Sequence, residues 1–259
     1  MTRQKKRRGS DVKQAIVDKI VSSPQRAESL PNRRQVKLYL KQYFAQVPVE
    51  DMQGRDEDIM ARVALDHLDF GARRRKGRVL VRIYNPTFED HGYSSPYTII
   101  EMVNDDMPFL VDSVSAAVNR HDLAVHMTVH PIIRVHRDER GKLEKICTKD
   151  VDSGHRESYI RIALDRETDP LRLKLLKQEI TKVLGDVRVS VRDWQKMRRR
   201  MTETRDLLEL GPHGVDEELR AESQALLDWL VDDHFTFLGY REYRLTTSGK
   251  KMFLEAVES

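Results

Sequence analysis

The feature that most constrains the fold of this chain is a central segment in which short alternating apolar runs are interleaved with helical repeats. Apolar residues at every second position indicate strands, and apolar residues three or four positions apart indicate one face of a helix. Glycine, proline and aspartate mark the boundaries between these runs. In chain order, the sequence predicts strands over 79–83 and 97–103, a helix over 110–119, strands over 123–137, 143–148 and 160–164, a helix over 171–184 and a closing strand over 187–191.

The helix starts in this segment follow from local side-chain chemistry. Asp105 or Asp106 is expected to cap the first helix near Pro108, because short polar side chains accept hydrogen bonds from the free amides of a helix N-terminus. Asp169 should start the second helix, and Gly185 should end it. The resulting order of strand, helix, strand, strand, helix and strand, with one additional strand at the front, is the split βαβ or ferredoxin-like plan. The predicted fold class is therefore α+β, with an antiparallel sheet and both helices on one face.

Helical periodicity on either side of the central segment predicts a chain of four parts. Gly71 and its neighbours should end the first helical part, and the glycines and proline over 211–214 should interrupt the second one. The predicted parts are an N-terminal helical region over 1–76, an α/β sandwich domain over 77–192, a helical connector over 193–234 and the start of a further, truncated domain over 235–259.

The charge balance and the hydropathy pattern argue against nucleic acid and membranes as partners. The chain has 46 Lys and Arg residues against 42 Asp and Glu residues, a net charge of only +4 at pH 7. The densest basic runs adjoin expected helix ends and tails, where cations are well solvated. No apolar run approaches the roughly eighteen residues that a membrane helix needs. We therefore expect a cytoplasmic protein, and the single Cys147 excludes an internal disulfide.

Sequence motifs for catalysis, cofactors and metals are missing. The patterns GxGxxG, GxxxxGK[ST], HExxH and GxSxG do not occur. His126, His130 and His136 share one side of an extended run, but four residues of strand span about 13 Å, too far for two ligands of one ion. We expect no catalytic, cofactor-binding or metal-binding residue here. RNA binding by the same topology is a weaker alternative, because only Tyr97 and Tyr159, at strand starts, offer aromatic rings for base stacking.

Four longer segments carry a resemblance to a known family. They are NDDMPFLVDSV from Asn104, VHPIIRVHRDERGKL from Val129, ESYIRIALDRE from Glu157 and LDWLVDDHFTFLGYREYRL from Leu227. In this order they resemble the N-terminal, ACT-like region of the large NAD-specific glutamate dehydrogenases. The resemblance implies a parent enzyme that converts L-glutamate and NAD to 2-oxoglutarate and ammonia, with its catalytic domains far downstream. It also implies that NAD binds elsewhere in the parent, and that the partners of this region are other domains and subunits of a homo-oligomer.

ACT-like domains commonly bind small amino acids at the loop between the first strand and the first helix. The resemblance therefore implies an effector site with the candidate residues Asn104, Asp105, Asp106, Met107, Pro108, Phe109 and Asp112. Amides near Pro108 and Phe109 would meet the ligand's carboxylate, and Asp105 or Asp106 would meet its ammonium. Phe109 stands where effector-binding members usually carry glycine. The alternative is a scaffold that only holds subunits together, with the Phe109 side chain filling the site.

Overall fold

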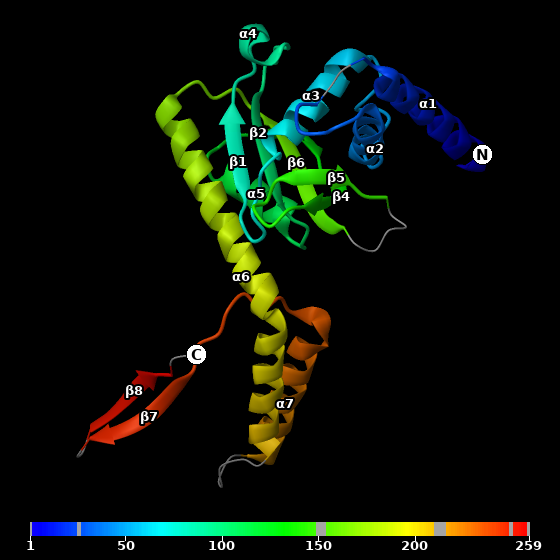
Figure 1. The fold of residues 1–259 in the computed structure, drawn as a ribbon. Helices are drawn as coiled ribbons and strands as arrows, with labels where there is room; N and C mark the ends of the chain where they lie inside the picture. Colours follow the sequence, from blue (N-terminus) through cyan, green and yellow to red (C-terminus); the bar gives the residue numbers. More distant parts are fainter. Residues whose placement is uncertain (1, 25–26, 149–153, 210–215, 249–250, 258–259) are drawn as a thin grey trace. The chain divides into compact units, whose positions relative to one another are not determined.

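The computed structural model describes residues 2–24, 27–148, 154–209, 216–248 and 251–257 (Figure 1). Its internal contacts divide the chain into two compact units, Met1–Gly185 and Asp186–Ser259, and each is described by itself. The first unit contains the predicted N-terminal helical region together with the sheet. These two units are defined by contacts alone, and the division into four parts from the sequence stays a prediction.

A six-stranded antiparallel sheet forms the centre of the first unit. Its spatial order is β1-β2-β6-β4-β5, and β3 also pairs with β6. The strands are β1 (Leu80–Tyr84), β2 (Thr98–Asp105), β3 (Val125–Val129), β4 (Ile132–Arg137), β5 (Leu143–Ile146) and β6 (His155–Leu164). The α+β class with an antiparallel sheet, as predicted from the sequence, is confirmed.

Strands β3 and β4 lie one after the other along the same side of β6. Val129 is the partner of Arg161, and Ile132 is the partner of Ser158, so the chain continues in the same direction across a short interruption. At that interruption the Tyr159 amide donates a hydrogen bond to the Pro131 carbonyl at 3.0 Å. The long apolar run predicted as a strand over 123–137 is therefore two strands, and the proline has its place between them, where its missing amide costs no ladder hydrogen bond.

The predicted closing strand over 187–191 is wrong, and so is the predicted helix end at Gly185. Residues Pro170–Glu209 form one continuous helix, α6. A run of alternating valines fits a helix as well as a strand, because Val187 and Val191 are four residues apart and share a helix face. Sequence periodicity over five residues could not separate these two possibilities.

The edge position beside β2 is filled by β1 instead. The two strands pair antiparallel, with Leu80 opposite Val103 and Tyr84 opposite Ile99. The additional strand that the sequence predicts at the front of the domain is thus the one that pairs with this side of β2. Once this edge is paired, the sheet needs no contribution from the segment after Gly185.

Helices α5 (Leu110–Asn119) and the first part of α6 pack on one face of the sheet, as predicted. Glu179 of α6 accepts hydrogen bonds from Arg120 Nε at 2.8 Å and pairs with His121 Nε2 at 2.7 Å, directly after α5. Ile100 and Ile162 are partners on the adjacent strands and are fully buried. The buried helix side chains are Leu110, Val114 and Val118 of α5, and Leu176, Ile180 and Leu184 of α6.

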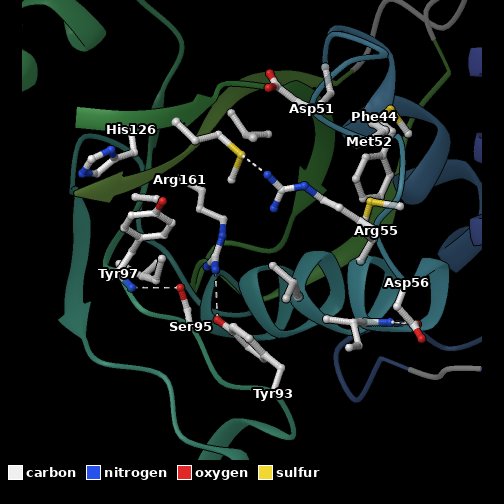
Figure 2. Close-up of a pocket in the computed structure, with 18 of the residues that line it drawn as sticks. Phe44, Asp51, Met52, Arg55, Asp56, Tyr93, Ser95, Tyr97, His126 and Arg161 are labelled. Atoms are coloured by element: carbon white, nitrogen blue, oxygen red, sulfur yellow. Dashed lines mark hydrogen bonds between the residues drawn. The ribbon is translucent and has the colours of Figure 1, made fainter. Parts of the chain in front are cut away.

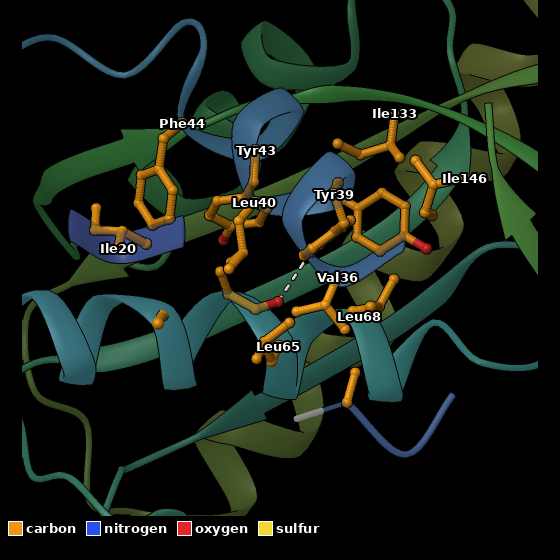
Figure 3. Packing of buried hydrophobic residues seen from close by; sticks show 14 of the residues in the cluster. Ile20, Val36, Tyr39, Leu40, Tyr43, Phe44, Leu65, Leu68, Ile133 and Ile146 are labelled. Atoms are coloured by element: carbon orange, nitrogen blue, oxygen red, sulfur yellow. Dashed lines mark hydrogen bonds between the residues drawn. The ribbon is translucent and has the colours of Figure 1, made fainter. Parts of the chain in front are cut away.

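The opposite face of the sheet carries the main apolar cluster of the first unit. It is covered by helices of the N-terminal region, and Figure 3 shows their large side chains meeting those of β4 and β5. These helices are α1 (Thr2–Ser22), α2 (Arg33–Phe44) and α3 (Glu57–Phe70). Asn32 and Asp56 cap α2 and α3 by accepting hydrogen bonds from backbone amides. The Tyr39 hydroxyl donates to the Ala64 carbonyl at 2.9 Å, which fixes α2 against α3.

The second unit consists of the remainder of α6, helix α7 (Glu217–Trp229), a short π-helical turn (Leu230–His234) and a hairpin. The hairpin strands are β7 (Tyr243–Ser248) and β8 (Lys251–Ala256). Helix α7 has no buried residue among its described side chains. The predicted helical connector is helical up to Glu209 and again from Glu217, and the predicted interruption over 211–214 lies outside the described residues.

Candidate functional site

The loop between β2 and α5 holds most of the candidate residues, and its helix start differs from the predicted one. Helix α5 begins at Leu110, with Phe109 as the residue before it. Phe109 has φ +68°, in the left-handed region that favours glycine, and no side chain caps the helix. The prediction that Asp105 or Asp106 caps α5 is wrong, because both carboxylates are engaged by other partners.

Asp105 ties the end of β2 to the segment before β1. Its carboxylate accepts hydrogen bonds from Arg74 Nη2 at 2.6 Å and from the Gly77 amide at 3.1 Å. The same Arg74 nitrogen also donates to Glu157 at 2.6 Å, and both Arg74 and Glu157 are almost completely buried. Because Arg74 is buried and binds the carboxylates of both Glu157 and Asp105, Asp105 is held in a structural role.

Asp106 has a more accessible partner. Its carboxylate accepts a hydrogen bond from the Ser158 hydroxyl at 2.9 Å and forms an ion pair with Arg156 at 2.7 Å. The side chain of Arg156 is 54% exposed, and that of Asp106 is 15% exposed. A surface ion pair of this kind contributes little to stability, and its exposed arginine moves easily. Of Asp105 and Asp106, it is therefore Asp106 whose partner a ligand's ammonium can displace more easily.

The other candidate residues are arranged around these two. Asn104 is buried on β2, Met107 is half-buried, and Pro108 and Asp112 are exposed. The Phe109 side chain is 47% exposed. The loop therefore presents an apolar ring and a proline next to the free amides at the start of α5, with Asp106 at its border.

A buried charge network on the opposite face of the sheet was missed by the sequence reasoning. Glu101 lies at the centre of β2 and is fully buried. It forms ion pairs with Arg161 of β6 and, at 2.5 Å, with Arg82 of β1. Arg82 continues to Asp66 of α3, also at 2.5 Å. Burial alone would raise the pKa of the Glu101 carboxyl, but its neighbours His67, Arg161 and Arg82 together outweigh this effect and hold the pKa below its usual value.

His67 of α3 adjoins this network and is completely buried. Burial lowers the pKa of His67 to about 4, so the imidazole is neutral near pH 7. Its Nε2 lies 3.2 Å from the Met102 carbonyl oxygen, and its Nδ1 lies 3.2 Å from the Tyr43 hydroxyl. Because a carbonyl can only accept, Nε2 carries the proton and Nδ1 accepts from Tyr43. All polar atoms of the ring are thus used in joining α2, α3 and β2.

The sequence does hold a signal for this network. Glu101 interrupts the apolar strand YTIIEMV, and Arg161 interrupts SYIRIALD at the register position directly opposite. A charge with apolar neighbours on both sides in a strand buried on both faces requires a partner of opposite charge. The periodicity located both strands, but their pairing register was needed to connect the two charges.

The described residues contain no group of three or more His, Cys, Asp or Glu side chains placed to hold a metal ion. None of the described helices is long and apolar enough to cross a membrane.

Comparison with known proteins places this arrangement in a family. The family model described as "Glutamate dehydrogenase, ACT1 domain" matches residues 39–180, more than half of the chain. This chain belongs to that family. The match runs from within α2 to within α6, so it includes the sheet, α5 and the start of α6 on one face, and α3 with the second half of α2 on the other.

Three curated relatives of this ACT1 domain are named NAD-specific glutamate dehydrogenase. The protein from Halomonas elongata is 33% identical over 228 residues, which are 87% of this chain and 14% of the relative. The protein from Pseudomonas aeruginosa is 33% identical over 211 residues, or 81% of this chain and 13% of the relative. The protein from Mycobacterium tuberculosis is 28% identical over 182 residues, or 69% and 11%. The chain therefore spans about a seventh of the length of these relatives.

Proposed function

We propose that this chain is the N-terminal regulatory and assembly region of an NAD-dependent glutamate dehydrogenase and is itself non-catalytic. The parent enzyme would convert L-glutamate and NAD to 2-oxoglutarate and ammonia, with NAD bound in other domains. The family membership of residues 39–180 carries this proposal, supported by the three relatives of the same name. The missing glycine-rich phosphate cradle supports the non-catalytic role, because dinucleotides are held by such loops.

The proposal is tested by titrating NAD into the purified chain and by assaying glutamate-dependent NADH formation. We expect neither saturable NAD binding nor turnover, whereas the full-length parent should show both. Saturable binding of NAD to the chain alone would overturn the non-catalytic assignment.

The assembly role is supported by the apolar surface of the second unit. Its exposed large apolar side chains include Leu207, Leu219, Leu226, Trp229, Phe235, Leu238, Leu245, Met252, Phe253 and Leu254. Soluble domains rarely expose apolar residues so densely unless a partner covers them. We infer that other domains or subunits of the parent cover α7 and the β7–β8 hairpin. Amide hydrogen exchange over 217–229 should be slower in the full-length parent than in the isolated chain, and equal rates would contradict the inference.

An amino-acid effector at the β2–α5 loop is the regulatory part of the proposal. The ligand's carboxylate would bind the free amides at the start of α5, and its ammonium would bind Asp106 by displacing the exposed Arg156. Coupling to the catalytic domains then requires different affinities in two enzyme states, typically about 5- to 150-fold. The competing view is a scaffold without a ligand.

Calorimetric titration of amino acids separates the two views. We expect binding to the wild-type chain and a loss of affinity in Asp106→Asn. Glu139→Gln, which removes an exposed carboxylate in the β4–β5 turn, is the matched control and should leave binding unchanged. No heat with any amino acid, together with unchanged effector kinetics of full-length Asp106→Asn, would leave the scaffold view.

A further inference from the structure

A cavity between the helical cover and the sheet lies on the face opposite α5, away from the β2–α5 loop. Its volume is about 430 Å³, within the range of small-molecule sites. The walls come from the end of α2, the α2–α3 connection, α3, the segment over 93–97 and the centre of the sheet (Figure 2). Its apolar lining includes Tyr43, Phe44, Met52, Met60, Ile99 and Ala163. Such a lining suits a bulky apolar group.

One cation in this cavity is already satisfied. The Arg161 guanidinium binds Glu101 and donates hydrogen bonds to the hydroxyls of Tyr84 at 3.1 Å and Tyr93 at 3.0 Å. Figure 2 shows it directed towards Tyr93. The Arg161 guanidinium forms part of the cavity wall. Its charge is neutralised by Glu101, so it is not the group that would attract an anion.

A second cation is not neutralised in this way. The side chain of Arg55 reaches across the cavity, and its guanidinium donates to the Met127 sulfur at 3.6 Å (Figure 2). A thioether is a weak acceptor. No carboxylate of the described residues lies within ion-pair distance of this guanidinium. Arginine binds carboxylates strongly, often through two parallel hydrogen bonds.

Acidic groups near Arg55 have different roles. The Asp56 carboxylate accepts a hydrogen bond from the Ile59 amide at 2.9 Å, as the cap of α3. Asp51 also lines the cavity, and no hydrogen bond or ion pair involves its side chain among the described residues. The cavity thus presents an available cation and an available anion beside an apolar interior. These are the complementary groups for a zwitterion with an apolar side chain.

We propose that this cavity binds a small carboxylic acid with a bulky apolar side chain, held by Arg55, and that Asp51 makes it prefer the α-amino acid over the corresponding 2-oxo acid. The apolar side chain would enter the interior between Phe44, Met60 and Ile99. The carboxylate would take the place of the Met127 sulfur as the partner of Arg55. This site is separate from the β2–α5 loop and does not depend on an effector binding there.

The binding test uses the purified chain and four probes: L-leucine, L-phenylalanine and their 2-oxo counterparts, 4-methyl-2-oxopentanoate and phenylpyruvate. We expect saturable calorimetric binding, tighter for the amino acids. The amine 2-phenylethylamine has the ring and the ammonium but no carboxylate, and it should bind at least ten-fold more weakly than phenylalanine. Absence of binding by all four acids, or equal binding of the amine, overturns the proposal.

Paired variants assign the roles of the two charged residues. Arg55→Gln should weaken all four acids by about ten-fold or more, since a charge-assisted bidentate pair is lost. Arg62→Gln removes the same charge from an exposed position on α3 outside the cavity and should have no effect. Equal affinities of these two variants would overturn the role of Arg55.

Asp51→Asn should remove the preference for amino acids over 2-oxo acids, with Glu50→Gln as the exposed neighbouring control. If the preference survives in Asp51→Asn, the role of Asp51 is wrong. Far-UV circular dichroism of each variant checks that it is folded. Amino-acid binding that is lost in Asp106→Asn but kept in Arg55→Gln belongs to the β2–α5 loop and not to this cavity.

Discussion

The two units of this chain differ in the side chains that they bury and expose. The first unit buries charges: Glu101, Arg161 and Glu157 are all less than 10% exposed. Glu101 is paired with Arg161, and Glu157 is paired with Arg137. The second unit exposes apolar groups, and every residue of β8 is exposed. Buried, paired charges are found in a well-packed interior, whereas a dense set of exposed apolar side chains indicates a surface that a partner covers. We therefore propose that the first unit carries its own stability and that the second offers a surface for association.

The largest effect that tests this comparison is expected from breaking one ion pair in each unit. Arg161→Met leaves Glu101 buried with Arg82 as its remaining arginine partner, and we expect a loss of about 3–5 kcal/mol in the free energy of unfolding. Arg205→Met in the second unit removes an exposed pair with Asp228, at 2.8 Å, and should lower the free energy of unfolding far less. Urea unfolding measures both values. Similar losses would show that the two units do not differ in this way.

The next effect is a pH dependence that belongs to the first unit. The pKa of His67 falls from 6.5 to about 4 on folding because the ring is buried. Between pH 6.5 and pH 4 the unfolded chain therefore binds a proton that the folded chain does not bind. The stability associated with neutral His67 is fully present above pH 6.5 and is lost as the pH falls towards 4. The loss is at most roughly 3 kcal/mol.

The variant His67→Gln keeps a neutral amide in this position but has no group that titrates in the window. Its free energy of unfolding should change less between pH 6.5 and pH 4 than that of the wild type. His155→Gln, at an exposed position on β6, is the control and should behave as the wild type. If all three proteins show the same pH dependence, His67 is not its source.

A smaller effect is expected at the start of α5. Phe109 adopts φ +68°, which costs about 1 kcal/mol or more for a residue with a Cβ atom. Phe109→Gly removes this strain but adds backbone freedom to the unfolded chain, so we expect a net gain of about 0.5 kcal/mol. Phe109→Ala keeps the Cβ atom and should give no gain. A melting temperature raised equally by both substitutions would assign the effect to the lost ring instead.

The smallest effect on folding is expected from the apolar surface of the second unit. Leu226→Glu changes an exposed position on α7 and should alter the stability of the isolated chain by no more than about 0.5 kcal/mol. The same change should weaken assembly of the full-length parent in sedimentation experiments. Large destabilisation of the isolated chain would show that this side chain is part of an interior.

The comparison also explains how far the sequence could predict the structure. Strands β2 and β6 and helix α5 were predicted because each is long enough to show its period and is bounded by proline, glycine or aspartate. The segment 187–191 was misassigned because five alternating residues fit both periods, and the outcome depended on β1 occupying the edge beside β2. That competition between distant segments cannot be read from local patterns.

The candidate site shows the same limit. The position of the β2–α5 loop followed from the pattern, but the roles of its acidic residues did not. Asp105 is engaged by Arg74, which precedes it by 31 residues, and Asp106 by Ser158, which follows it by 52. The local sequence rule predicted that one of them caps the helix, whereas in the folded chain both bind side chains that are distant in the sequence. The cavity at Arg55 had no local signal, because its walls come from four separate parts of the chain.

The division into two units gives each of them its own optical reporter. Both tryptophans, Trp194 and Trp229, lie in the second unit and are 39% and 49% exposed, so their fluorescence emission should shift to shorter wavelength when a partner covers them. The first unit has no tryptophan but contains the fully buried Tyr39, Tyr43 and Tyr159. Burial raises the pKa of each of these phenols. Their ionisation in alkali, followed by ultraviolet absorbance, therefore reports the opening of the first unit in the same sample and without any label.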